Sequence, residues 1–210
     1  MVVYNEHGLN GAMRDRRSIR LKGYDYAGTG AYFVTLCTWN RECLFGNFED
    51  GEMNLNGLGV IVQEEWLRTA ELRKAVETDA FVIMPNHIHG IVVITGGGDR
   101  STCIPEEDIV LNESPGRPGG SWESPSLSLG SIVRGFKSAT KIRVNEARGS
   151  PRAAVWQRNY HEHVIRGELD LERVRRYIAE NPSRWTEDDN HPSRMKHVGY
   201  PGVWYGTCDR

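Results

Sequence analysis

Two histidines are the residues of this chain with the clearest chemical potential. His87 and His89 lie in the apolar run Met84-Pro-Asn-His-Ile-His-Gly-Ile-Val-Val-Ile94. Successive side chains of a strand point to opposite faces, so both imidazoles point the same way. Burying two such rings is costly unless they bind something, and a divalent metal ion is the obvious ligand. Two ligands are too few, so a third is expected from elsewhere in the fold. A pair of histidines satisfied by ordinary hydrogen bonds is the structural alternative.

A tyrosine and an asparagine near the end of the chain form a second candidate group. Leu171, Val174 and Ile178 recur at helical spacing, and Tyr177 lies next to this apolar stripe. Asn181 follows Tyr177 by four residues, so the two side chains share one face and point at one spot near the sheet. A half-buried aromatic and a C-terminal cap before proline would explain the pair equally simply. A metal ion beside this phenol would instead suit an attack on a phosphate.

Tyr160 is the second candidate nucleophile. It is flanked by His161 and His163, but it lacks the helical partner that Tyr177 has. Together with Trp156, Tyr160 could also form a stacking surface for nucleic acid bases, or simply pack under the last helix.

Charge is distributed unevenly along the chain, although the formal net charge is only −2. The segment 131–180 carries 11 Lys/Arg and 6 Asp/Glu, whereas 42–79 carries 3 and 9. Such asymmetry indicates a basic face for phosphates, although ordinary solvated helix faces would also produce it. The basic residues predicted to contact phosphates are Arg14, Arg16, Arg17, Arg20 and Lys22 near the N-terminus, and Arg134, Lys137 and Lys141 on a later helix.

The cysteines and the hydropathy indicate a cytoplasmic protein without a membrane partner. The four cysteines form no C-x-x-C pair, so we expect free thiols in a reducing compartment. No apolar run approaches the length of a membrane span, and no N-terminal signal segment is apparent.

The pattern of elements predicts an α+β fold. Strands are expected at 31–38, 79–84 and 87–95, a helix after the cap Asn56, and helices at 127–147 and 169–180, with a short extended segment between the last two. Helices interspersed with strands suggest a ferredoxin-like sandwich, an antiparallel or mixed sheet with helices packed on it. We expect a basic N-terminal arm at 1–30, a catalytic domain at 31–185 with a flexible insertion at 96–130, and a C-terminal tail at 186–210.

Several ordered motifs resemble the single-tyrosine HUH transposases, in particular the branch of REP-associated tyrosine transposases. The resemblance covers roughly residues 17–185 outside the insertion. The matching segments are Ala31-Tyr-Phe-Val-Thr35, Met84-Pro-Asn-His-Ile-His-Gly90, Trp156-Gln-Arg-Asn-Tyr160, Glu162-His-Val-Ile-Arg166 and Tyr177-Ile-Ala-Glu-Asn-Pro182.

The resemblance implies a role for each matching position. His87, His89 and Asn181 would bind a divalent ion, Mg²⁺ or Mn²⁺, and Tyr177 would be the nucleophile. The implied partner is single-stranded or hairpin DNA, gripped in part by the basic N-terminal region, in a cytoplasmic, nucleoid-associated protein. Either a monomer or a homodimer is compatible with the family. It implies no role for the insertion or for the tail beyond Trp185.

The chemistry implied is cleavage and rejoining of single-stranded DNA near hairpin-forming repeats. Tyr177 would form a 5′-phosphotyrosine and release a 3′-hydroxyl, and the reverse attack would rejoin strands without ATP. A free phenol has a pKa of about 10, so a nearby cation should help it to ionise. The metal, Arg173 and Arg176 are possible sources. The alternatives are a hairpin-binding protein without cleavage activity and a metal-dependent hydrolase that uses only His87 and His89.

Overall fold

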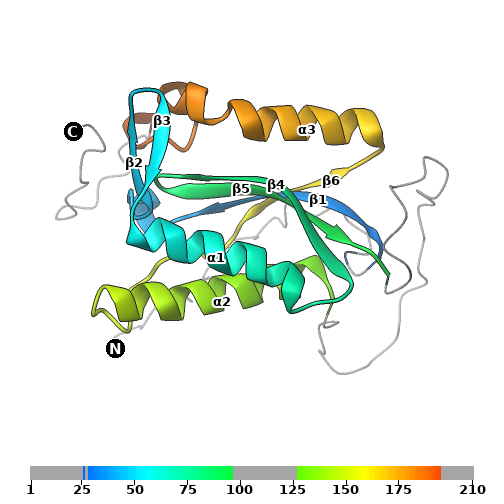
Figure 1. Cartoon of the computed structure of the whole chain (residues 1–210), viewed down its shortest axis with the longest axis horizontal. Helices are drawn as coiled ribbons and strands as arrows, with labels where there is room; N and C mark the ends of the chain where they lie inside the picture. The colour runs from blue at the N-terminus through cyan, green and yellow to red at the C-terminus, as the bar shows by residue number, and fades with distance from the viewer. Residues whose placement is uncertain (1–25, 27, 97–126, 195–210) are drawn as a thin grey trace, which may run out of the picture.

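A four-stranded antiparallel sheet forms the centre of the molecule, as a computed structural model shows for residues 26, 28–96 and 127–194 (Figure 1). Its strand order is β4-β5-β1-β6, and a separate hairpin pairs β2 with β3. The elements are β1 (Gly30–Cys37), β2 (Gly46–Glu49), β3 (Glu52–Leu55), α1 (Gly57–Glu71), β4 (Val76–Met84), β5 (His87–Ile94), α2 (Leu129–Ala147), β6 (His161–Ile165) and α3 (Glu168–Glu180), with 3₁₀ turns at Trp39–Arg41, Pro182–Glu187 and Pro192–Arg194.

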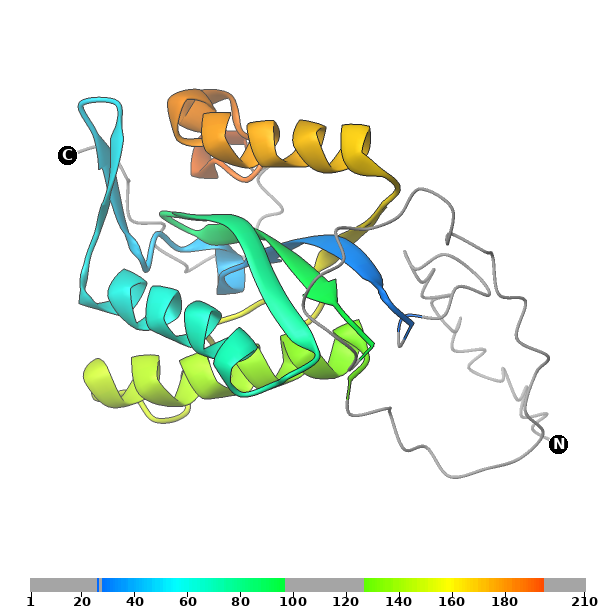
Figure 2. The same cartoon turned by 45° about the vertical axis from the view of Figure 1, so that its right-hand side comes forward.

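The topology is that of a ferredoxin-like fold. Without the hairpin, the chain order β1-α1-β4-β5-α2-β6 is the βαββαβ pattern, and every neighbouring strand pair is antiparallel. Helices α1 and α2 cover one face of the sheet and α3 covers the other, as both Figure 1 and Figure 2 show. The predicted α+β class and sandwich architecture are therefore confirmed, and the sheet is antiparallel throughout.

Strand β5 separates two apolar cores, because its side chains alternate between the faces. Ile88 and Val92 join the larger core beneath α1 and α2. Ile91 points the other way and packs against the buried stripe of α3, which consists of Leu171, Val174 and Ile178. The histidines share the parity of Ile91, so the fold directs both imidazoles toward α3.

The helix ends follow local capping chemistry. The Asn56 side chain accepts hydrogen bonds from the backbone N–H groups of Leu58 and Gly59, and Ser128 caps α2 in the same way. Helix α3 stops at Asn181 because Pro182 disfavours helical geometry in the residue before it. The predicted start of β4 differs most: the strand begins at Val76, before Asp79, because its irregular register near Thr78 hides the alternation in the sequence, whereas the other strand and helix bounds differ by two residues at most.

Some predictions concern residues outside the described ranges, among them the N-terminal arm with Arg14, Arg16, Arg17, Arg20 and Lys22, and most of the insertion. Cys37 is a free cysteine, but Cys43 is disulfide-bonded, so the expectation of free thiols was wrong for Cys43. Sequence spacing cannot show which thiols approach each other in space. In the described ranges, every helix is too short or too polar to cross a bilayer.

Gly90, which directly follows His89 in β5, allows helix α1 to pack closely on the sheet. A Cβ atom built there would lie 2.3 Å from Cζ2 of Trp66, a side chain that is only 1% exposed. Gly90→Ala should therefore lower the free energy of unfolding by about 1–3 kcal/mol, since a rigid buried indole must move. The measurement is urea unfolding. Gly57→Ala is the control, because its Cβ would meet no atom within 4 Å; equal stability of the Gly90→Ala variant and the wild type would contradict the packing argument.

Candidate functional site

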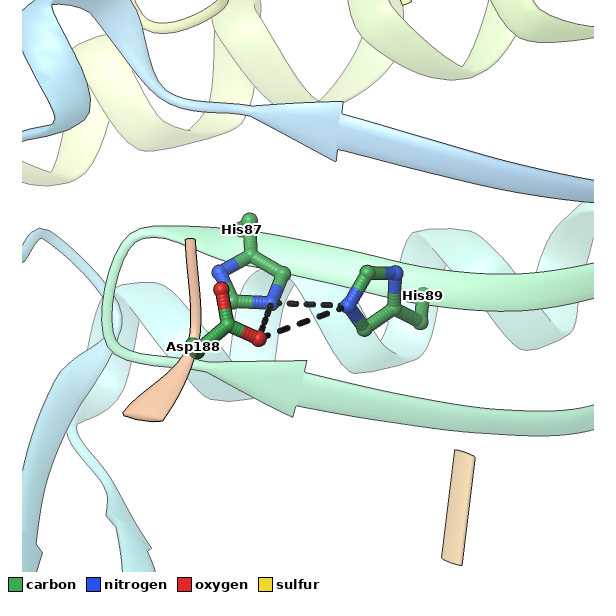
Figure 3. A group of neighbouring side chains, drawn as sticks. All are labelled: His87, His89 and Asp188. Atoms are coloured by element: carbon green, nitrogen blue, oxygen red, sulfur yellow. Dashed lines mark hydrogen bonds and ion pairs between the residues drawn. The ribbon is translucent and has the colours of Figure 1, made fainter. Parts of the chain in front are cut away.

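His87 and His89 lie at the start of β5, directly after the turn from β4, and both are buried. Their Nε2 atoms face each other at 3.0 Å, as Figure 3 shows. Two imidazole nitrogens at this separation on one strand face can act on a single small ligand. The geometry predicted from the His-Ile-His spacing is therefore present.

The outer nitrogen of each ring has a partner that sets its orientation. Asn86 Nδ2 donates to the carbonyl oxygens of Arg41 at 3.1 Å and Asn190 at 2.8 Å, which fixes the direction of its amide. Asn86 Oδ1 consequently accepts a hydrogen bond from Nδ1 of His87 at 2.8 Å. This bond places the hydrogen on Nδ1 and leaves the lone pair of His87 on Nε2, where a metal ion would need it.

Thr35 has the corresponding position beside His89. It pairs with His89 in the register between β1 and β5, and its Oγ1 lies 2.8 Å from Nδ1 of His89. A hydroxyl can either accept or donate, so Thr35 permits the tautomer that also frees Nε2 of His89.

Asp188 is the third member of this cluster, and the sequence analysis missed it. Its Oδ2 lies 3.8 Å from Nε2 of His87 and 4.0 Å from Nε2 of His89 (Figure 3). One ligand atom from each of the three residues lies within 4.8 Å of the others, and all three residues are buried. Such a His-His-Asp group could bind a metal ion. Asp188 belongs to an irregular segment just after the 3₁₀ turn Pro182–Glu187, so no periodic pattern marks it.

Tyr177 and Asn181 reach the same place from α3. The Tyr177 hydroxyl lies 3.4 Å from Nε2 of His89, while the Tyr177 side chain remains 43% exposed. Asn181 is buried, its Nδ2 donates to Asp188 Oδ2 at 3.1 Å, and its Oδ1 has no hydrogen-bond partner among the described residues. The predicted convergence of two imidazoles, a phenol and an amide is thus observed.

Burial and the neighbouring charges set the protonation of the cluster. Burial, and next the neighbouring His89, lower the pKa of His87 to about 3, and burial also lowers the pKa of His89. Burial alone would raise the pKa of Asp188, but the adjacent imidazoles of His89 and His87, together with hydrogen bonds from the backbone N–H of Asn190 and from Asn181, hold it well below its usual range. At neutral pH the cluster therefore offers two neutral imidazoles and one carboxylate, a donor set with charge −1 that suits a divalent cation.

The phenol of Tyr177 is protonated in this environment. Burial raises its pKa, and the negative charge of Asp188 raises it further. Arg173, one of the predicted cation sources, instead lies 3.6 Å from Asp170 and is largely exposed. The arginines that do line the cleft around Tyr177 are Arg41 and Arg184, and Arg184 is paired with Glu180 at 2.9 Å.

An open cleft of about 650 Å³ gives access to the cluster. Its lining includes Tyr177, Asn181, Asp188, Thr35 and Tyr160. The runner-up nucleophile Tyr160 therefore shares the cleft, whereas the hydroxyl of Tyr177 lies 3.4 Å from Nε2 of His89. The position of Tyr177 beside His89 distinguishes the two phenols.

The basic residues predicted on α2 differ in accessibility. Arg134 and Lys141 are exposed. Lys137 instead donates from Nζ to the carbonyl oxygens of Gln157 at 2.9 Å and Asn159 at 3.0 Å, and burial lowers its pKa to about 8. Lys137 thus ties α2 to the segment before β6.

Two features of the site, a buried acceptor and the hydrogen bonds of the imidazoles, show that the donor set fits a bound metal ion. Asn181 Oδ1 is a buried acceptor that receives no hydrogen bond from residues 26, 28–96 and 127–194, and an ion next to the His-His-Asp group would satisfy it. The two imidazoles already carry the outer hydrogen bonds that metal-binding histidines usually have.

No established family profile matches the chain. An uncharacterized protein of Haemophilus influenzae is 38% identical over 179 residues, which are 85% of this chain and 94% of that protein. This chain belongs to the same protein family. Among solved structures, a REP-associated tyrosine transposase bound to a REP hairpin is similar over 94% of each chain, with 20% identity and a TM-score of 0.47. A proposed transposase of Deinococcus radiodurans is similar over 77% of this chain and 95% of that one, with 13% identity and a TM-score of 0.42.

Proposed function

We propose that this protein is a metal-dependent single-tyrosine transposase of the HUH type, a nuclease that cuts and rejoins single-stranded DNA through a covalent tyrosine link. One observation carries the proposal: the Tyr177 hydroxyl lies 3.4 Å from Nε2 of His89, beside a buried His-His-Asp group. A nucleophile and a cation site at this separation can act on the same phosphate. The motifs from Ala31 to Pro182 that resemble this family support the same function.

The proposed metal is Mg²⁺ or Mn²⁺, held by His87, His89 and Asp188, with Asn181 Oδ1 as a further ligand. When bound, such an ion supplies positive charge that offsets the charge of the scissile phosphate. Two imidazoles favour Mn²⁺ over the harder Mg²⁺, whereas the carboxylate and the amide oxygen accommodate either.

Tyr177 is the proposed nucleophile. Its phenolic oxygen forms a bond to phosphorus and loses its proton, while the bond from phosphorus to the 3′ oxygen breaks and that oxygen takes up a proton. The products are a 5′-phosphotyrosine on Tyr177 and a free 3′-hydroxyl. Because one phosphoester replaces another, a 3′-hydroxyl can attack the link in reverse and rejoin strands.

The proposed partner is single-stranded DNA that carries hairpin-forming repeats, encountered in the cytoplasm. Because Asp188 is a proposed metal ligand, the proposed catalytic domain extends beyond the expected bound at 185 into the segment that was expected to be the C-terminal tail. The basic arm at 1–30 remains a predicted hairpin contact.

A covalent-trapping assay tests the function. The protein is incubated with end-labelled hairpin oligonucleotides taken from the DNA flanking its own gene, with Mn²⁺, with Mg²⁺ or with EDTA, and is analysed on denaturing gels. We expect a protein-linked product with metal and none with EDTA. Hairpin binding without any cleavage would identify a binding protein instead, and cleavage without a protein link would identify a hydrolase that activates water.

Removing the hydroxyl of Thr35 should weaken metal binding. Thr35→Val keeps the shape of the side chain but takes away the hydrogen-bond partner of His89 Nδ1, which lies 2.8 Å away. Loss of such an outer contact costs about 10- to 100-fold in metal affinity, and we expect about 10-fold for one hydroxyl. Isothermal titration with Mn²⁺ measures it. Thr35→Ser, which retains the hydroxyl, should bind close to the wild-type level, and equal affinities for the Val and Ser variants would count against the role of Thr35.

A further inference from the structure

A second hollow lies next to the cleft of the proposed active site. It has a volume of about 300 Å³, and its lining includes Arg134, Lys137, Arg158 and Tyr160. Tyr160 also lines the larger cleft that contains Tyr177, so the two hollows share one wall. The described residues that line the smaller hollow include no aspartate or glutamate.

The two arginines of this hollow have guanidinium groups that are unpaired among the residues the structure describes. Arg134 and Arg158 are exposed, and neither forms an ion pair with any residue that the structure describes. Arg143 on the same helix is different, because it pairs with Glu64 and Glu65. An unpaired guanidinium in a hollow without carboxylates is suited to hold a phosphate, which it can bind through two parallel hydrogen bonds.

Lys137 and Tyr160 form a fixed platform between the hollows. The Nζ atom of Lys137 lies 5.5 Å from the centre of the Tyr160 ring, within the range of a cation–π contact. The same ammonium binds the carbonyl oxygens of Gln157 and Asn159, so it anchors the segment that carries both Arg158 and Tyr160. An anchored aromatic ring beside free cations is the usual arrangement for binding a single nucleic acid strand.

We propose that this hollow is a nucleotide subsite for single-stranded DNA, adjoining the strand in the catalytic cleft. Arg134 and Arg158 bind a backbone phosphate, and Tyr160 stacks on a base where the strand passes from one hollow to the other. The subsite rests on the proposed function, since a strand must lie in the cleft before it can continue past Tyr160. It extends that function by a binding step that needs neither metal nor Tyr177.

The test measures strand binding in EDTA, so that no cleavage occurs. Fluorescein-labelled oligothymidylates of about 4, 8 and 16 nucleotides, spanning the usual site sizes for single strands, are titrated with the full-length protein by fluorescence anisotropy. The double variant Arg134→Ala/Arg158→Ala should bind the longest strand about 10-fold or more weakly, and the shortest within about 2-fold of wild type. The slope of log K against log salt should fall by about 1.4 for two lost phosphate contacts.

A charge-matched control separates a subsite from general attraction. Lys74→Ala/Arg152→Ala also removes two exposed cations, but neither residue lines either hollow. This variant should leave the affinity for the longest strand within about 2-fold. An equal loss in both double variants, or no loss in the Arg134/Arg158 variant, overturns the subsite.

Substitutions of Tyr160 test the stacking contact independently of the arginines. Tyr160→Leu should weaken binding of the longer strands about 10-fold, because it removes the aromatic face, whereas Tyr160→Phe should retain it. Equal binding by the two variants overturns the stacking role. The binding test does not depend on cleavage, so its result stands even if the covalent assay detects no adduct. If the wild type forms the adduct but the Arg134→Ala/Arg158→Ala variant loses no affinity for the longer strands, the subsite is refuted and the proposed function is not.

Discussion

Tyr177→Phe is expected to abolish the covalent protein–DNA product. The substitution removes only the oxygen that lies 3.4 Å from Nε2 of His89, and the ring can keep its edge contact with Phe33, whose centroid is 5.8 Å away. Loss of a nucleophile costs several orders of magnitude, so the rate of adduct formation should fall by more than about 10⁴-fold. The measurement is adduct formation on a labelled hairpin with Mn²⁺, followed on denaturing gels.

Binding must be followed in parallel, because a lost adduct could also reflect lost affinity. The Tyr177 side chain is 43% exposed and lies at the edge of the cleft, so the affinity of Tyr177→Phe for the uncleaved hairpin should stay within about 3-fold. Tyr160→Phe is the matched control, since it removes the other phenol of the cleft and should leave the adduct intact. If the Tyr177→Phe protein still forms the adduct, or if Tyr160→Phe loses it, Tyr177 is not the nucleophile.

The histidine pair and the Tyr177–Asn181 pair were both predictable, because each depends on one regular period. A strand places residues two apart on one face, and a helix does the same for residues four apart. The apolar neighbours also indicated which face is buried. Their meeting at one point depends further on the packing of α3 over β1 and β5, where the Phe33 ring lies 5.3 Å from that of His89 and 5.8 Å from that of Tyr177.

Asp188 was not predictable in the same way. It lies in an irregular segment whose position is set by contacts with residues far away in sequence, including Asn86 Nδ2 to the Asn190 carbonyl and Arg41 to the Asp189 carbonyl. No local period encodes such contacts. Lys137 shows a second limit: its helical spacing predicted a phosphate contact, and spacing gave no sign that the chain folds two carbonyl groups onto its ammonium. Periodicity identifies a face, and the loops that cover it decide what remains accessible.

Asp188→Asn is expected to reduce Mn²⁺ affinity by about 100-fold and to slow adduct formation strongly. The amide preserves the size of the carboxylate but removes the negative charge of the donor set, which otherwise consists of two neutral imidazoles. Charge supplies much of the affinity of hard divalent ions for oxygen ligands. Isothermal titration gives the affinity, and urea unfolding without metal shows that the fold is retained. Asp189→Asn is the neighbouring control, since the Asp189 side chain is 99% exposed and should have little effect.

The same titration distinguishes the ligand seen in the structure from the one predicted by resemblance. Asn181→Ala removes the buried Oδ1, which has no hydrogen-bond partner in the described part of the chain, but leaves His87, His89 and Asp188 in place. The three-residue group should therefore still bind Mn²⁺, about 10-fold more weakly. If both side chains contact the ion, the double variant should lose more affinity than either single variant. Undiminished Mn²⁺ binding by Asp188→Asn, with binding lost in Asn181→Ala, would instead show that Asn181 is the third ligand and that Asp188 only orients its amide, through the 3.1 Å bond from Nδ2.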